Sequence, residues 1–175
     1  MFRSIFLLLL CFGGALRAQN TLFEKITIEN GLSQGMIFDI LQTRDGFLWV
    51  ATKDGLNRYD GYNFKVFSND PFDPFSIAGN SVAKLFEDSR GLLWVGLNAK
   101  GLDVYVSSSG RFHHFPIAFN DSKIFNSTET TAIAEAPDGS VWFAQRSGDL
   151  WRIVVPTDWQ NGLFTDATPK SVQAT

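Results

Sequence analysis

A segment of eight residues, Asp45–Thr52, recurs along the chain as Arg90–Leu97 and Asp138–Gln145. Each copy places a tryptophan three residues after a glycine, and an apolar residue and then a small residue follow the tryptophan. Successive tryptophans are 45 and 48 residues apart. Internal repeats of this length are typical of propellers and repeat arrays, in which each repeat is one supersecondary unit. This repeat constrains the fold more than any other feature of the chain.

Glycine-containing turn signals divide each repeat into short segments that are rich in strand-forming residues. In the first repeat these signals are Asp45-Gly46, Asp54-Gly55 and Asp60-Gly61, where glycine supplies a positive φ. We therefore predict strands at 36–42, 48–52, 56–59 and 64–67, at 82–87, 93–97, 102–106 and 112–115, and at 131–135, 141–144 and 150–154.

The second strand of each repeat is apolar without alternation, as in Leu48-Trp49-Val50. A strand that is apolar on both sides is covered on both faces of its sheet. The small residue after it, which is Ala51, Gly96 or Ala144, leaves room for a side chain of a neighbouring sheet. The sequence thus predicts an all-β protein: an incomplete β-propeller of about three four-stranded antiparallel blades, plus a leading strand.

The leading strand is predicted at Phe23–Ile28, which alternates loosely and ends at the turn-prone Asn30-Gly31. In a closed ring such a strand completes the last blade. Beyond the third repeat the pattern fails at Pro156, because proline cannot donate a hydrogen bond to a ladder. The partial propeller is therefore expected over 23–155, with blades at about 31–69, 76–116 and 127–155, exposed loops at 70–79 and 116–128, and an irregular tail at 156–175.

Three blades do not close a ring, so the first and third blades are each expected to leave an apolar face or edge uncovered. Two explanations remain open. The chain is a fragment of a longer protein that supplies the missing blades, or several copies of the chain associate.

Residues 1–18 are predicted to be a signal peptide. Arg3 supplies a positive start, an apolar stretch runs from Ile5 to about Leu16, and Ala18 is a suitable residue before the cleavage site. A membrane anchor is the alternative, although the apolar stretch is shorter than the ~20 residues of a spanning helix. The single cysteine, Cys11, leaves with the signal, so we expect an exported chain without disulfides or thiol chemistry, and without membrane contact of its own.

Charge and histidine content argue against several function classes. The formal net charge of −3 disfavours nucleic-acid binding, which depends on clustered lysine and arginine. Adjacent residues of a strand point to opposite faces, so the histidine pair His113-His114 is not expected to hold a metal ion. Asp70 and Asp73 lie in an ordinary loop sequence without the calcium-loop pattern. We therefore predict no metal and no cofactor.

The sequence also singles out no catalytic residues, because it contains no conspicuous Ser/His/acid arrangement and no specially spaced carboxylate pair. Asp45 and Asp138 precede the turn glycines and are interpreted as turn residues rather than acids. The tryptophans Trp49, Trp94 and Trp142 are expected in the core between blades rather than exposed for stacking on sugars. The residues that bind a ligand are left unassigned.

The opening Ile26–Ser33, followed by the run Asp45–Gly61, resembles the two-component regulator propeller repeat. The likeness covers about Phe23 to Val154 and is weakest in the third repeat, where Arg146–Leu150 replaces the usual Gly-Leu step. It implies the N-terminal periplasmic sensor of a hybrid two-component histidine kinase and response regulator. In that family further blades, an immunoglobulin-like domain, a membrane span, a kinase, a receiver and a DNA-binding domain follow the first blades.

The resemblance implies signal transduction through a phosphorelay, with an oligosaccharide as the expected ligand. This chain has no kinase histidine motif, no nucleotide-binding glycine loop and no receiver aspartate context, so the chain itself is predicted not to be an enzyme. Two other functions remain open. The chain is the start of a secreted propeller lyase or glycosidase, or it is a truncated, non-functional remnant.

Overall fold

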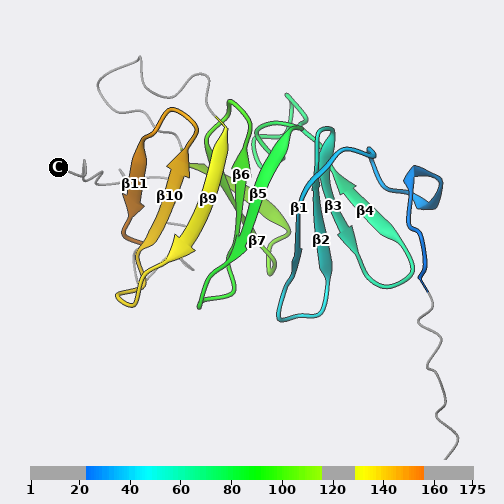
Figure 1. Ribbon diagram of the computed structural model, residues 1–175, viewed down its shortest axis with the longest axis horizontal. Coiled ribbons are helices and arrows are strands. Elements are labelled where there is room, and N and C mark those ends of the chain that lie inside the picture. Colours follow the sequence, from blue (N-terminus) through cyan, green and yellow to red (C-terminus); the bar gives the residue numbers. More distant parts are fainter. Residues whose placement is uncertain (1–22, 116–128, 156–175) are drawn as a thin grey trace, which may run out of the picture.

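The computed structural model describes residues 23–115 and 129–155, whose strands form three antiparallel sheets standing side by side (Figure 1). The sheet orders are β1-β2-β3-β4, β5-β6-β7-β8 and β11-β10-β9. The strands are β1 (Ile37–Gln42), β2 (Leu48–Thr52), β3 (Gly55–Tyr59), β4 (Phe64–Phe67), β5 (Val82–Glu87), β6 (Leu93–Leu97), β7 (Leu102–Val106), β8 (Arg111–Phe115), β9 (Thr130–Glu135), β10 (Val141–Gln145) and β11 (Leu150–Ile153). The predicted strands from 36 onward are thereby confirmed, with ends that differ by one residue at most.

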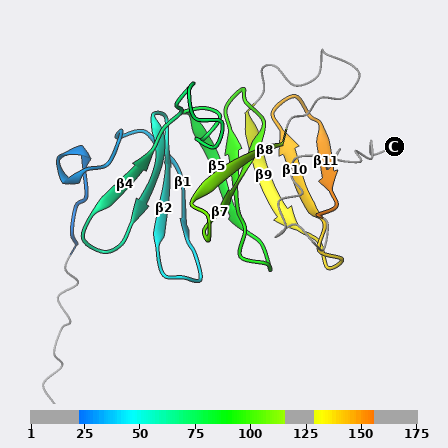
Figure 2. The same cartoon turned by 180° about the vertical axis from the view of Figure 1, so that it is seen from behind.

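Each sheet corresponds to one sequence repeat, and we call the sheets blade 1 (β1–β4), blade 2 (β5–β8) and blade 3 (β9–β11). The first strands of the blades are neighbours, since β1 contacts β5 and β5 contacts β9. The view from behind shows that the blades follow one another in chain order across the molecule (Figure 2). The all-β, propeller-like fold predicted from the sequence is confirmed.

The predicted leading strand is not formed. Residues 23–27 are irregular, and Ile28–Asn30 form a short 3-10 helix instead. Thr27 caps this turn: its hydroxyl accepts a hydrogen bond from the N–H of Glu29, and its own N–H donates to Asn30 Oδ1 at 2.8 Å. A strand needs a partner strand, and no described strand pairs with residues 23–27. Local turn chemistry therefore decides the conformation.

Each blade presents two different faces to its neighbours. In blade 1, Trp49, Ala51 and Leu56 share one face, because Trp49 pairs with Arg58 and Ala51 with Leu56 across β2 and β3. We call the face that carries the second-strand tryptophan the tryptophan face, and the opposite one the receiving face. The tryptophan face of blade 1 packs on the receiving face of blade 2, in a core that contains Trp49, Ala51, Leu56, Val82, Leu85, Val95, Tyr105 and Phe112.

The same packing joins blades 2 and 3. A second core contains Trp94, Leu102 and Val104 from blade 2, and Val141, Phe143, Trp151 and Ile153 from blade 3. Gly96 lies on the tryptophan face of blade 2, and a Cβ atom at this position would lie 2.6 Å from Thr130 Cγ2 of blade 3. The predicted role of the small residue after the tryptophan, which is to leave room for the next blade, is confirmed here.

The extent to which neighbouring blades bury the faces of a sheet differs from blade to blade. Every residue of β6 is buried, as predicted for a second strand that is covered on both faces. Along β10, buried residues alternate with half-buried ones, because only the receiving face of blade 3 is covered by a described blade. Trp49 and Trp94 are buried as predicted, whereas Trp142 is half-buried. The prediction of a core position therefore fails for this third tryptophan.

The loop 70–79 was predicted to be exposed, and this prediction is only partly correct. Its first half is exposed, but Ile77 is fully buried in the core between blades 1 and 2. The predicted loop 116–128, the signal peptide 1–18 and the tail 156–175 lie outside the described residues. Over residues 23–115 and 129–155, the structure contains no helix with the length and hydropathy of a membrane span.

Candidate functional site

The turns between the first and second strands of the three blades lie along one edge of the sheets, at the bottom in Figure 1. In each turn, the N–H of the glycine donates to the carbonyl of the residue three positions earlier. The pairs are Gly46 to Thr43 at 2.8 Å, Gly91 to Asp88 at 3.0 Å and Gly139 to Ala136 at 2.9 Å. We call this edge the turn rim. It contains polar contacts at both junctions between blades.

Each turn also supplies an acceptor for the indole N–H of its own tryptophan. The donor and acceptor pairs are Trp49 Nε1 to Thr43 Oγ1 at 3.1 Å, Trp94 Nε1 to Asp88 Oδ2 at 3.0 Å and Trp142 Nε1 to Ser140 Oγ at 3.1 Å. Thr43 and Asp88 occupy the same repeat position, six residues before the tryptophan. Ala136 stands there in the third repeat and cannot accept through its side chain, so Ser140 takes over.

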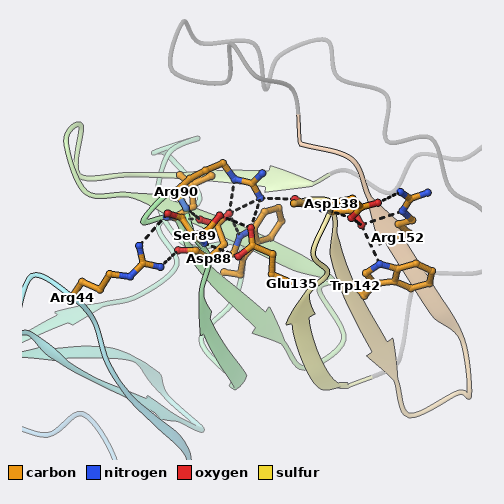
Figure 3. Close-up of polar contacts among 12 residues, drawn as sticks. Arg44, Asp88, Ser89, Arg90, Glu135, Asp138, Trp142 and Arg152 are labelled. Atoms are coloured by element: carbon orange, nitrogen blue, oxygen red, sulfur yellow. Dashed lines mark hydrogen bonds and ion pairs between the residues drawn. The ribbon is translucent and has the colours of Figure 1, made fainter.

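Asp88 is fully buried at the centre of this rim (Figure 3). Its carboxylate accepts from Arg90 Nε at 2.9 Å, from Trp94 Nε1, and from the N–H groups of Arg90 at 2.9 Å and Leu92 at 3.0 Å. Arg90 Nη2 also donates to the carbonyl of Gly139 in blade 3 at 2.9 Å. Because a buried carboxylate is stable only when its oxygens are paired, Asp88 and Arg90 form one unit that joins two blades.

One further contact occurs at both junctions. The N–H of Arg44 in blade 1 donates to Glu87 Oε2 in blade 2 at 3.0 Å. The N–H of Ser89 in blade 2 donates to Glu135 Oε2 in blade 3 at 2.7 Å, and its hydroxyl donates to Oε1 at 2.6 Å. Both donors stand five residues before the tryptophan of their repeat, and both acceptors seven before. We call this repeated contact the glutamate clamp.

Asp138 ends the rim at blade 3 (Figure 3). It accepts from the hydroxyl of Ser140 at 2.6 Å, from the N–H of Ser140 at 3.0 Å, and from Arg152 Nη2. These bonds, chiefly that from the Ser140 hydroxyl, lower the pKa of Asp138 from 3.8 to about 2. Asp138 is therefore a turn residue, as predicted. Its carboxyl group is ionised at neutral pH and is poorly suited to act as a general acid. Asp45 likewise accepts from the Thr43 hydroxyl within its own turn, at 2.5 Å.

A polar residue in the third strand anchors the segment that leads into its blade. Asn57 Oδ1 accepts from the N–H of Ser33 at 2.8 Å, and Asp103 Oδ2 accepts from the N–H of Ala78 at 2.8 Å. Both side chains are buried, and both follow a Gly-Leu pair in the sequence. These anchors hold 33 and 78 at equivalent places in blades 1 and 2.

The histidine pair packs the loop 70–79 against blade 2. His114 Nδ1 lies 2.8 Å from Asp103 Oδ1, and its Nε2 lies 3.1 Å from the carbonyl oxygen of Pro74. Both partners are acceptors, an arrangement that suits the doubly protonated ring. The hydrogen bond to Asp103 accordingly raises the pKa of His114 above 6.5, whereas burial lowers the pKa of His113. The ring of His113 lies beside that of Phe75.

Asp70 and Asp73 shape the same loop. Asp70 Oδ1 accepts from the N–H of Phe72, and Asp73 Oδ1 accepts from the N–H of Phe75, each at 2.9 Å. Each aspartate thus closes its own turn. Across the described ranges, no group of three or more His, Cys, Asp or Glu side chains is arranged to hold a metal ion.

The turn rim is therefore a structural feature, since its donors and acceptors position one blade on the next. Sequence analysis missed the glutamate clamp and the anchors at Asn57 and Asp103. A signal for both was present, because Glu87 and Glu135 fall at one repeat position, and Asn57 and Asp103 at another. Those positions lie outside the apolar pattern on which the alignment of the repeats relied.

Blades of this kind, packed tryptophan face on receiving face, define a segment of a β-propeller. Residues 31–54 match the family described as two component regulator propeller. The chain thus carries a two component regulator propeller repeat, and the resemblance predicted from the sequence is confirmed.

Two kinds of relative support this assignment. Histidine kinase P4 of Formosa agariphila is 47% identical over 66 residues, which are 37% of this chain and 5% of the relative. The extracellular domain of a hybrid two component system from B. thetaiotaomicron superposes with a TM-score of 0.67 at 23% identity, over 75% of this chain and 19% of that one. The extracellular domain of a one component system from the same organism gives a TM-score of 0.60 at 24% identity, over 76% and 17%.

At these identities the solved structures show a shared fold. The chain spans only about a twentieth of the curated relative and less than a fifth of either solved domain. Its described residues are propeller strands and their connections, and no catalytic domain is among them. In fold, the chain corresponds to a part of the extracellular propeller of two-component systems.

Proposed function

We propose that the chain is the opening part of a periplasmic, ligand-sensing propeller of a two-component receptor, and that the ligand is an oligosaccharide. The main support is the 47% identity with Histidine kinase P4 over 66 residues. This chain also carries the two component regulator propeller repeat. Export agrees with the extracellular location of the similar solved domains and with the signal-like residues 1–18.

Such a receptor signals because the ligand binds one arrangement of the protein more tightly than another. A ligand shifts a conformational equilibrium only by this difference in affinity. The blades of this chain are hydrogen-bonded sheets joined by the turn rim and by two apolar cores. They would pass on a change at their loops as a displacement of whole blades rather than of single side chains.

Calorimetric titration of the purified chain with neutral and uronic-acid-containing oligosaccharides tests the proposal. We expect saturable binding of at least one class, with no new reducing or unsaturated ends in the recovered sugar. Release of such ends would instead assign a lyase or glycosidase. The absence of binding throughout the panel would contradict an oligosaccharide ligand for these blades. Chain unfolded in urea is the control for non-specific heats.

A further inference from the structure

The two ends of the described propeller segment expose complementary faces. Val82 and Leu85 on the receiving face of blade 2 are 0% and 8% exposed, because blade 1 covers them. Their counterparts in blade 1, Ile37 and Ile40, are 44% and 55% exposed. At the other end, Leu150 on the tryptophan face of blade 3 is 44% exposed, whereas its counterparts in the first two repeats are buried. Among the blades that the structure describes, one face of each type is thus left without a covering blade.

We propose that these two faces bind each other between copies of the chain, with the tryptophan face of blade 3 against the receiving face of blade 1 in a second copy. The contact would continue the packing already present at both internal junctions. It does not depend on the ligand.

The aromatic residues on the uncovered faces match those of the junction between blades 1 and 2. There, Trp49 packs edge-on against Tyr105, with ring centroids 5.1 Å apart, and Tyr105 packs against Phe112 at 4.9 Å. Blade 1 carries the same pair on its receiving face, since Tyr59 stacks on Phe64 at 4.6 Å. This pair is only half-buried, as is Trp142 of blade 3. The pair Tyr59–Phe64 has the chemistry of a site for Trp142.

A second match involves the arginine opposite the tryptophan. Arg58 pairs with Trp49 across β2 and β3. Burial raises the pKa of Tyr105 in the next blade, and the positive charge of Arg58 partly opposes this rise. Arg152 pairs with Trp142 in the same way and lies over its ring, with Cζ 5.8 Å from the centroid. The counterpart of Tyr105 on blade 1 is Tyr59. The junction between blades 2 and 3 instead uses the apolar residues Val104 and Ile153 at these two positions.

The glutamate clamp supplies a third match, because blade 3 lacks the donor of the clamp and blade 1 lacks its acceptor. Blade 3 has Pro137 where Arg44 and Ser89 donate their N–H groups, and proline has no N–H. Blade 1 has Gln42 where the clamp has a glutamate. A contact between blade 3 and blade 1 therefore lacks both halves of the clamp, so no carboxylate is left without its donor. A blade with glutamate at this position would bury that carboxylate against Pro137.

The contact joins different faces of the two copies, so it is heterologous and its variants complement one another. Sedimentation equilibrium of the purified chain should show concentration-dependent association. Ile40→Lys and Leu150→Lys should each give monomers, since every contact needs one intact face of each type. An equimolar mixture of the two variants should re-form a one-to-one complex. Phe72→Lys, at an exposed loop position outside both faces, is the matched control and should associate like the original chain.

Circular dichroism should show that the variants remain folded, as expected for substitutions at exposed positions. Restoring the clamp in one chain by Pro137→Ser with Gln42→Glu should tighten association by about tenfold, whereas Gln42→Glu alone should weaken it. A monomeric original chain, or variants that fail to complement, would overturn the proposal. The first result would leave both faces for other blades of a longer protein, without affecting the sensor function, which the titration with oligosaccharides tests separately.

Discussion

Single polar residues decide how the blades of this protein are held together. Arg90, Glu87 and Glu135 each bridge two blades, and Asp88 holds Arg90 in place for its bridge. Each of the four stands at a fixed distance from a tryptophan in its repeat. The sequence predicted the turns that contain Asp45 and Asp138, because glycine and aspartate have strong local preferences. It did not predict which polar groups would meet, since that depends on how neighbouring blades are rotated against each other.

His114 gives the molecule a pH dependence whose sign follows from its partners. The pKa of His114 is raised above 6.5 by Asp103, so its contribution to stability is fully present below the pKa of the unfolded chain. That contribution is lost as the pH rises through the folded pKa. His113 works in the opposite direction, because burial lowers its pKa and charging it costs stability as the pH falls.

We therefore expect the difference in free energy of unfolding between the original chain and His114→Gln to be largest at about pH 5 and to shrink toward about pH 9. Urea denaturation across this range measures the difference. Both proteins retain His113, so the effect of burial on its pKa cancels, whereas the smaller effect of the His114 charge on His113 is part of the measured difference. An equal difference at both ends of the range would rule out this role for His114.

At the scale of strands and turns, local sequence was a reliable guide wherever the partner strand lies within the same repeat. β1 to β11 follow the predicted segments because each hairpin is closed by its own turn residues. The prediction of a leading strand was wrong because the partner of that strand would have to come from another blade. The burial of Ile77 was missed for a related reason, since it fills a gap between two blades that no single repeat defines.

Gly96 offers a test of packing between strands of different blades. Gly96→Ala places a methyl group against Thr130 and should cost about 1–3 kcal/mol of unfolding free energy, because a closely packed junction must open. Gly35→Ala is the matched control: its new methyl group meets nothing within 4 Å, so we expect a change within about 0.5 kcal/mol.

Urea denaturation provides the measurement. Adding Thr130→Ser, which removes Cγ2, should recover part of the loss in Gly96→Ala. A loss at Gly96 no larger than that at Gly35 would show that the junction yields without strain.

For the whole molecule, stability should be highest in the middle. Blade 2 is covered on both faces, whereas blades 1 and 3 each have one face that no described blade covers. Because each blade contacts only its sequence neighbours, the outer blades can open without disturbing the other end. The half-exposure of Trp142 belongs to this scale as well, since the residue is buried only when another blade, from the same chain or from a second copy, covers the tryptophan face of blade 3.

Hydrogen exchange followed by mass spectrometry, on dilute protein, should show slowest exchange in β6 and β7 and faster exchange in the corresponding strands of blades 1 and 3. The physical reason is that opening β6 exposes both apolar cores at once. Equal protection across the three blades would show that they unfold as a single cooperative unit.

The glutamate clamp has a consequence for how such proteins gain blades. Its donor and acceptor lie two residues apart in one repeat, the acceptor serving the preceding blade and the donor the following one. A tandem duplication of the second repeat would therefore produce a new blade already able to clamp both of its neighbours. The third repeat, with Pro137, retains only the acceptor, so a duplicate of it could join the blade before it but would not clamp the blade after it.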